Sequence, residues 1–432
     1  MICDNLKVNE QGHLLFAERD TTLLAQKYGT PLYVMDESRI RYNIRQYVNA
    51  MKEAFGEKFL LLYASKACSF KEMYRIANDE NIGVDVVSEG EIYTAKAAGF
   101  PMHRAHFHGN NKTDREISLA MDASVGYFVV DHADELVAIS KEAQRRSITQ
   151  KILLRITPGI DTHTFEAVMT GQVDSKFGSA IETGHAQEIT RLALSLEGIS
   201  LEGFHCHVGS QVFDSDTFFM SADIMLSFIA DIREKFGYTA KELDLGGGYG
   251  VRYLDSDPYI DIADNIRQVA EHIKAACKRL SLPVPTILLE PGRSIVADAG
   301  MTLYTVGSIK RLDGYKNYVS VDGGMSDNPR FALYGAPYTV VLPEKMHESC
   351  DFECSVVGKC CESGDILQEN VKLPQSVKRG DLLAVLTTGA YNYSMASNYN
   401  RNPRPPVVML SEQSERVVVR RESLEDIIRN DL

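Results

Sequence analysis

The stretch FLLLYASKA (residues 59–67) contains the apolar run FLLLYA, which is followed directly by Ser65 and Lys66. Its continuous apolar character is typical of a buried β-strand. A lysine at the end of such a strand places an amine at the rim of a sheet, where desolvation lowers the amine pKa and frees a nucleophile for Schiff-base chemistry. Taken alone, the run is better explained by a lysine that extends from the strand end into solvent. The rest of the chain must therefore decide between the two interpretations.

Similar apolar runs recur along the first 297 residues. They are FLLLYA (59–64), GVDVVS (83–88), RAHFHG (104–109), YFVVD (127–131), KILLRI (151–156), LEGFHCHV (201–208), ELDLGGG (242–248) and TILLEPG (286–292). Most gaps between them hold segments of helical period, for example at 70–81, 133–146, 186–196 and 262–280, and we expect residues 37–56 to open the barrel as a helix. Eight strands alternating with helices predict a TIM-like (β/α)8 barrel. A doubly wound sheet is the alternative, but the chain has no Rossmann fingerprint.

In a (β/α)8 barrel, functional groups gather at the carboxyl ends of the strands. Polar residues or glycines close several of the predicted strands, so we expect them to face one rim. They are Lys66, Ser88, His108, His207, the glycines 246–248 and Glu290.

The pattern changes after about residue 297, where strand-like pieces replace the alternation. They include 301–312, 318–324, 354–359, 382–390 and 416–421. We therefore predict a barrel over 36–297 and a β domain, a sandwich or a β-barrel, formed by 1–35 and 298–432. The segment 162–178 is long for a barrel connection, and such insertions are usually functional or disordered.

Composition narrows the class of protein. The 432 residues carry a formal net charge of −13, which argues against binding to nucleic acid or to an anionic membrane surface. The first ten residues have no signal-peptide pattern. The eight cysteines do not form a disulfide framework in a chain of this length, so we expect reduced thiols in a cytoplasmic protein. CDFEC (350–354) is too loosely spaced for a closed zinc site, and we expect no metal.

The strand ends offer a candidate for each group that pyridoxal phosphate (PLP) requires. Lys66 can form the Schiff base. LDLGGGYG (243–250) and EPGR (290–293) can hold the phosphate with backbone N–H groups. Glu290 can hold the pyridine nitrogen protonated. HCHVGSQ (205–211) places His205 and His207 on one strand face, where His207 can meet the ring.

Taken together, these motifs resemble fold-type III PLP-dependent decarboxylases of the alanine-racemase-like barrel class. YASKA (63–67), DVVSEGE (85–91), HGNNK (108–112) and DSKFG (174–178) contribute to the resemblance, which spans about residues 10–425. The C-terminal motifs are similar to diaminopimelate decarboxylases. These motifs are VDGGMSDNPRFALYGA (321–336), CCESGD (360–365), TTGAYNYSMASNYN (387–400) and VVVRRESLEDI (417–427).

The resemblance implies a role for each candidate residue. Lys66, His207, Glu290 and Cys361 are expected to be catalytic, with Cys361 as the proton donor after decarboxylation. The residues expected to hold the cofactor are Lys66, His207, Ser210, Gly247, Gly248, Glu290, Pro291, Gly292, Arg293 and Tyr391. The residues expected to bind substrate are Arg293, Arg330, Tyr334, Glu362 and Tyr391.

The implied reaction is the decarboxylation of meso-2,6-diaminopimelate to L-lysine, the last step of lysine biosynthesis. Each end of this substrate carries an amine and a carboxylate, so its distal end needs an acid and a base, which Glu362 and Arg330 supply. The alternatives are a decarboxylase of ornithine, arginine or carboxynorspermidine, an amino-acid racemase, or a non-catalytic regulator of this fold. The resemblance also implies a homodimer in which CCESGD of one subunit completes the site of the other.

Overall fold

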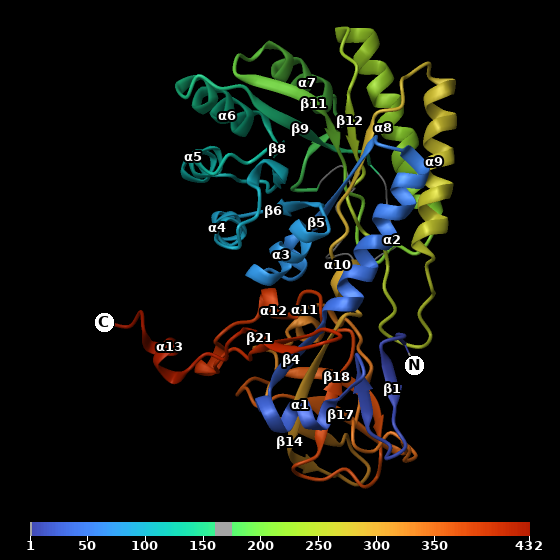
Figure 1. The fold of residues 1–432 in the computed structure, drawn as a ribbon, viewed down its shortest axis with the longest axis vertical. Coiled ribbons are helices and arrows are strands. Elements are labelled where there is room, and N and C mark those ends of the chain that lie inside the picture. The colour runs from blue at the N-terminus through green and yellow to red at the C-terminus, as the bar shows by residue number, and fades with distance from the viewer. Residues whose placement is uncertain (1, 160–174) are drawn as a thin grey trace. The chain divides into compact units, whose positions relative to one another are not determined.

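A computed structural model describes residues 2–159 and 175–432 (Figure 1). The chain divides into two compact units. The barrel unit comprises Asn43–Gly250 and Tyr259–Ser294, and the β unit comprises Met1–Tyr42, Val251–Pro258 and Ile295–Leu432. Most of the segment 162–178, for which the sequence predicts a functional or disordered loop, lies outside the described residues.

Eight parallel strands form the barrel unit's sheet, and pairing of β8 with β9 closes it. The strands are β5 (Phe59–Ala64), β6 (Gly83–Val86), β7 (Ala105–Phe107), β8 (Tyr127–Val130), β9 (Gln150–Thr157), β11 (Ile199–His205), β12 (Glu242–Asp244) and β13 (Thr286–Leu289). A two-residue strand, β10 (Ser179–Ala180), pairs with the end of β9. The predicted barrel is confirmed, and each predicted apolar run contains or overlaps one of the eight strands.

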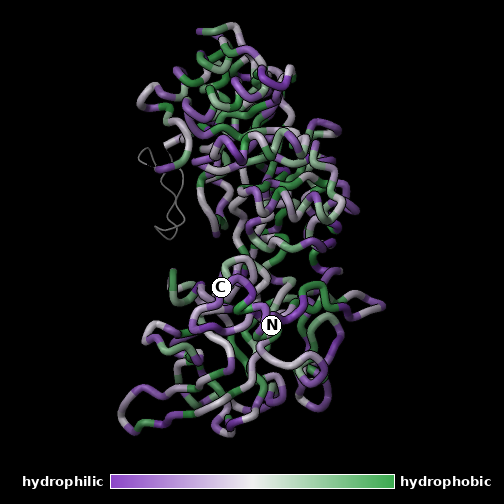
Figure 2. The backbone as a smooth tube through the Cα atoms, turned by 90° about the vertical axis from the view of Figure 1, so that its left-hand side faces the viewer, coloured by the Kyte–Doolittle hydropathy of each residue, from purple (hydrophilic) through white to green (hydrophobic). Residues whose placement is uncertain are grey.

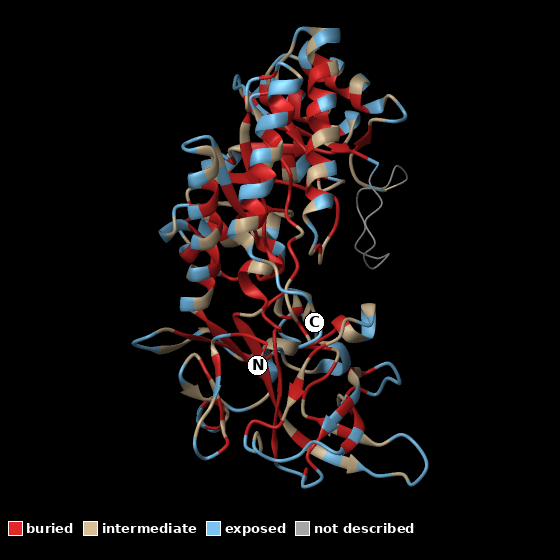
Figure 3. Ribbon diagram, turned by 90° about the vertical axis from the view of Figure 1, so that its right-hand side faces the viewer, coloured by how far each residue is buried: buried red, intermediate tan, exposed pale blue. Residues whose placement is uncertain are grey.

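Helices surround the strands of the barrel unit, with buried strands inside and exposed outer helix faces (Figure 3). They are α2 (Glu37–Phe55), α3 (Lys71–Asp79), α4 (Glu89–Ala97), α5 (Asp114–Asp122), α6 (Ala133–Arg145), α7 (His185–Ser195), α8 (Ser215–Phe236) and α9 (Ile262–Arg279). Local chemistry sets their ends. Thr113 and Glu116 form a capping box at the start of α5, and Gly237 ends α8 in the left-handed conformation.

The β unit contains a sheet in the order β18-β17-β15-β14-β4-β20-β21, to which β19 and β16 are joined through β14. Its strands are β4 (Leu32–Asp36), β14 (Gly300–Lys310), β15 (Tyr318–Val321), β16 (Val340–Val341), β17 (Phe352–Val357), β18 (Ile366–Leu373), β19 (Leu382–Val385), β20 (Val407–Leu410) and β21 (Glu415–Val419). A second sheet contains β1 (Leu6–Val8), β2 (Leu14–Phe16) and β3 (Arg19–Asp20). The short helices are α1 (Thr21–Tyr28), α10 (Arg293–Val296), α11 (Arg330–Tyr334), α12 (Asn392–Met395) and α13 (Leu424–Ile428).

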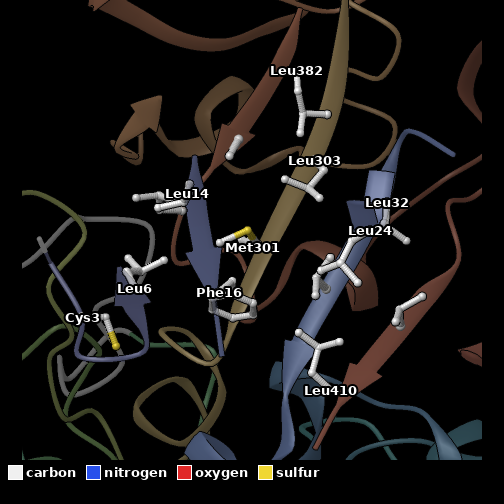
Figure 4. Packing of buried hydrophobic residues seen from close by; sticks show 14 of the residues in the cluster. Cys3, Leu6, Leu14, Phe16, Leu24, Leu32, Met301, Leu303, Leu382 and Leu410 are labelled. Atoms are coloured by element: carbon white, nitrogen blue, oxygen red, sulfur yellow. The ribbon is translucent and has the colours of Figure 1, made fainter. Parts of the chain in front are cut away.

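One apolar cluster joins the N-terminal strands to the large sheet of the β unit (Figure 4). Leu14 and Phe16 of β2 pack with Met301 and Leu303 of β14, and all four side chains are almost fully buried. Figure 2 shows hydrophobic and hydrophilic stretches intermixed along the backbone. Removing this apolar surface from water stabilises the sheet that carries the helices α11 and α12.

Candidate active site

Lys66 lies in a single 3-10 turn (Ser65–Ala67) directly after β5. The turn is held by Glu91, which accepts hydrogen bonds from Ser65 Oγ at 3.0 Å and from the backbone N–H of Val87 at 2.7 Å. Burial raises the pKa of Glu91 to about 7. Lys66 itself is exposed, so the desolvation of its amine predicted from the sequence is wrong in this structure. Its position at the carboxyl end of a barrel strand is as predicted.

Glu290 follows β13 and is buried between two histidines. His205 Nε2 lies 3.1 Å from Glu290 Oε2, and His108 Nε2 lies 2.7 Å from Glu290 Oε1. Burial opposes the charge of Glu290, but His108 and His205 outweigh it and hold the pKa of Glu290 well below its usual range. The barrel therefore contains an ionised carboxylate at the rim that carries Lys66. The ligand atoms of these three residues lie within 4.8 Å of one another and could also hold a metal ion.

The loops after β11, β12 and β13 form a cradle of closely packed backbone. A Cβ atom on Gly247 would lie 2.3 Å from the carbonyl oxygen of Glu290, and one on Gly292 would lie 2.9 Å from Ala64 Cβ. Gly248 has a φ of +111°, and its Cβ would lie 2.4 Å from Gly209 O. These positions therefore require glycine. For the buried N–H groups of Gly247 and Gly292, the described residues provide no hydrogen-bond partner, which suits a bound anion.

Ser210 and Arg293 lie at the same rim. Arg293 is buried and donates to Ser210 Oγ from Nε at 3.1 Å and from Nη2 at 2.9 Å. His207 follows β11, and burial together with the nearby Lys66 holds its pKa well below the usual range, so its ring is neutral at neutral pH. A neutral imidazole can lie flat against an aromatic ligand without the cost of a buried charge.

The β unit holds a second group of predicted site residues around Arg330. Arg330 begins α11 and is buried, with its guanidinium 4.9 Å from the ring centroid of Tyr391 and 5.1 Å from that of Tyr334. Its Nε has no hydrogen-bond partner among the described residues, and none of their carboxylates lies within 4 Å of the guanidinium. A buried cation in this state suits an anionic ligand.

Cys361 and Glu362 lie in the turn that joins β17 to β18, and both are exposed. Asp365 organises this turn, because its carboxylate accepts hydrogen bonds from the N–H groups of Cys360 and Met325, each at 2.6 Å. The N–H of Cys361 donates to Asn400 Oδ1 at 2.7 Å. All eight cysteines of the chain are free thiols.

The structure thus brings the predicted residues together in separate groups, one in the barrel unit and the others in the β unit. The sequence placed His108 at the functional rim and His205 on the strand face of His207, but no role was predicted for them or for Asp85 and Asp244. All four are buried near Glu290. The sequence signal for the two histidines is their position at the end of a predicted strand. His108 directly follows β7, and His205 ends β11 on the same face as His207.

Comparisons with known proteins agree with this arrangement. The sequence profile described as "Pyridoxal-dependent decarboxylase, pyridoxal binding domain" matches residues 41–297, so the fold and the site belong to the class of pyridoxal-dependent decarboxylases. Diaminopimelate decarboxylase from Bacillus subtilis (strain 168) is 45% identical over 424 residues, which cover 98% of this chain and 96% of that protein. Its counterpart from Staphylococcus aureus (strain COL) is 43% identical over 99% of both chains.

Solved structures give the same result. The crystal structure of diaminopimelate decarboxylase from M. jannaschii in co-complex with L-lysine has a TM-score of 0.90 at 33% identity, covering 99% of this chain and 98% of that one. The chain belongs to the diaminopimelate decarboxylase family. Among the described residues, no helix is both long enough and apolar enough to cross a membrane.

Proposed function

We propose that this protein is a PLP-dependent carboxy-lyase that converts meso-2,6-diaminopimelate to L-lysine and CO2, the last step of lysine biosynthesis. One observation carries the proposal. A lysine, an ionised buried glutamate and a glycine-lined cradle with unpartnered N–H groups meet at one rim of a barrel that belongs to this family. Each of these features suits one part of the cofactor, namely its aldehyde, its pyridine nitrogen and its phosphate.

The barrel domain, over residues 36–297, would bind the cofactor. Lys66 would hold it covalently, Glu290 would accept a hydrogen bond from its ring nitrogen, and His207 would cover one ring face. The phosphate would be held by the groups at the ends of β11, β12 and β13. These are Ser210, Gly247, Gly248, Pro291, Gly292 and Arg293. When bound, the cofactor supplies an electron sink for the electron pair that remains after the C–C bond breaks.

The β domain, formed by 1–35 and 298–432, would bind and protonate the substrate. The partnerless Nε of buried Arg330 supports a role in binding a carboxylate, with Tyr334 and Tyr391 beside the guanidinium. Glu362 would accept hydrogen bonds from the distal ammonium, and Arg293 would contact the substrate from the barrel side. Cys361 would hold a proton on Sγ and deliver it to the former α-carbon, which becomes the Cε of lysine.

The assembly is a further part of the proposal. A cytoplasmic homodimer, in which Cys361 and Glu362 of one subunit complete the site built around Lys66 of the other, accounts for the placement of these residues on an exposed turn. A two-fold interface would make both sites identical.

The test is to incubate the purified protein and PLP with meso-diaminopimelate, lysine, ornithine, arginine or carboxynorspermidine, and to follow CO2 release. We expect CO2 and lysine from diaminopimelate alone, and no CO2 with the Lys66→Ala variant. Preferential release of CO2 from ornithine, arginine or carboxynorspermidine would replace the proposed substrate. Absence of turnover for every substrate would favour a non-catalytic regulator.

A further inference from the structure

We propose that His108 and His205 are positioning residues that hold Glu290 ionised and fix both of its oxygens, so that it can accept a hydrogen bond from the cofactor's ring nitrogen. The inference rests on the proposed function, since it concerns how Glu290 is prepared for PLP. It assigns a role to two histidines that would not themselves touch substrate.

The geometry supports this role from two directions. His205 reaches Glu290 from the end of β11 and His108 from the residue after β7, so each carboxylate oxygen has its own imidazole nitrogen at 3.1 and 2.7 Å. The two rings contact each other edge to face, with centroids 5.0 Å apart and planes at 75°. Nδ1 of His205 is buried and has no hydrogen-bond partner among the described residues. Hydrogen bonding by the His205 ring is therefore directed at Glu290.

The proton positions follow from the acceptor. An ionised carboxylate can only accept hydrogen bonds, so His205 must carry its proton on Nε2 when it bonds to Glu290. Burial lowers the pKa of His205 to about 4, so the ring is neutral at neutral pH and donates its single N–H to the carboxylate. Each oxygen of Glu290 keeps a second lone pair, which leaves an acceptor position for a ligand.

The other charged groups nearby leave the negative charge on Glu290. Burial and the charge of Glu290 raise the pKa of Asp244 well above its usual range, so this neighbour stays protonated. Burial also raises the pKa of Asp85, whose Oδ1 lies 3.9 Å from His108 Nε2. Arg155 Nε lies 3.9 Å from Asp131 Oδ1, so the nearby guanidinium is paired with Asp131 and not with Glu290. His205 thus hydrogen-bonds to one oxygen of Glu290, His108 Nε2 lies 2.7 Å from the other, and the protonated Asp244 also interacts with the Glu290 carboxylate.

Without these two imidazoles beside its oxygens, burial would dominate and Glu290 would take up a proton. A neutral carboxyl group gives up the ionic attraction to a protonated pyridine nitrogen, so the protein's preference for PLP over an analogue with no basic ring nitrogen would fall. This consequence can be measured by binding alone, without turnover.

The experiment compares the affinities of PLP and of its deaza analogue, in which a C–H replaces the ring nitrogen, by equilibrium dialysis. His205→Leu removes the donor, whereas His205→Gln keeps an N–H near the position of Nε2. We expect His205→Leu to lower the preference for PLP at least tenfold and His205→Gln to keep it within about threefold of wild type. The same pair of substitutions at His108 gives a second test if either His205 variant fails to fold.

His106→Gln is the matched control, because His106 is a buried barrel histidine that stacks on Tyr127 and, among the described residues, forms no ion pair with Glu290, unlike His108 and His205. It should leave the preference unchanged, and Glu290→Gln should abolish it. An unchanged preference in the folded leucine variants would overturn the inference. If wild type binds neither compound, the proposed function fails rather than the role of the histidines.

Discussion

Arg293 donates two hydrogen bonds to the hydroxyl of Ser210, although 83 residues separate them in the chain. Nε and Nη2 lie 3.1 and 2.9 Å from Oγ, so this hydroxyl helps to orient the guanidinium at the rim where the glycine cradle lies. Because Arg293 is buried, a guanidinium N–H that loses its hydrogen-bond partner there costs free energy.

Ser210→Ala should weaken PLP binding by roughly five- to tenfold, corresponding to about 1 kcal/mol for one lost charge-assisted interaction and the loosened arginine. kcat at saturating PLP should stay near the wild-type value, because the variant leaves Lys66 and Glu290 in place. Titration of the apoprotein with PLP measures the effect. Ser195→Ala, on the exposed end of α7, is the matched control. Unchanged PLP affinity in Ser210→Ala would exclude the hydroxyl from the phosphate site.

Glu290→Gln should retain covalent binding of PLP at Lys66 but lower kcat by at least ten- to a hundredfold. The carboxylate is replaced by a neutral amide, so the ring nitrogen loses the charge that keeps it protonated, and each factor of ten is about 1.4 kcal/mol of transition-state stabilisation. Single-turnover CO2 release measures the effect. A wild-type rate in this variant would contradict the assignment of Glu290 to the ring nitrogen.

The barrel could be predicted from the sequence because strands buried on both faces are continuous apolar runs, which single-chain periodicity detects. The helices α4, α5 and α8 were implied by the predicted alternation of strands and helices, but their bounds were not predicted. In α8, apolar residues are spread widely around the helix, so its amphipathic period is weak. The inclusion of residues 251–258 in the β unit depends on long-range contacts such as Thr339 Oγ1 to Tyr253 O at 2.7 Å, which leave no local signal.

The site could be predicted in part for the same reason. Residues that follow the carboxyl ends of parallel barrel strands lie at the same rim, so the shared location of Lys66 and Glu290 could be predicted from the sequence. The pairing of Glu290 with His108 links residues 182 positions apart, on strands whose order around the barrel only the closed sheet defines. The apolar run alone allowed either an exposed or a desolvated lysine, and the structure shows Lys66 exposed.

His106 should make the stability of the protein sensitive to acid. Burial lowers its pKa from 6.5 to about 3, so between these values the unfolded chain binds a proton that the folded protein does not. Stability is therefore fully present above pH 6.5 and is lost as the pH falls toward 3, by about 2 kcal/mol at pH 5 from this residue alone.

Replacement of His106 by phenylalanine, which keeps the stacking on Tyr127, should reduce the fall in Tm between pH 7 and pH 5. Thermal unfolding of both proteins at the two pH values measures this difference. His103→Phe provides a control at a histidine that is exposed. An equal fall in Tm for wild type and His106→Phe would show that His106 is protonated in the folded state.

Lys112 and Glu135 form a fully buried ion pair, with Nζ 2.7 Å from Oε1 and also donating to the carbonyls of Gly109 and Val129 at 2.8 Å each. Lys112→Met should destabilise the barrel by about 3–5 kcal/mol, because it leaves the Glu135 carboxylate buried without its partner. The double variant Lys112→Met/Glu135→Leu should recover part of this loss. Chemical denaturation measures both, and equal stability of the single and double variants would contradict the coupling.

The last prediction concerns the proposed sharing of sites between two subunits. Lys66 belongs to the barrel unit and Cys361 to an exposed turn of the β unit. Lys66→Ala and Cys361→Ala should each be inactive as pure proteins. If Cys361 acts in the partner's site, a mixed dimer of the two variants contains one site with both lesions and one site with none.

Mixing the two inactive proteins through reversible dissociation should therefore restore activity. With random exchange half of the dimers are mixed and each has one intact site, so the recovered activity should approach roughly a quarter of wild type by symmetry alone. Exchange is verified separately by labelling each variant with a different mass tag, and mixing Lys66→Ala with itself is the control. If Cys361 acts within its own subunit, every site in the mixture keeps a lesion. No recovery after verified exchange would thus reject the shared site in favour of a self-contained subunit.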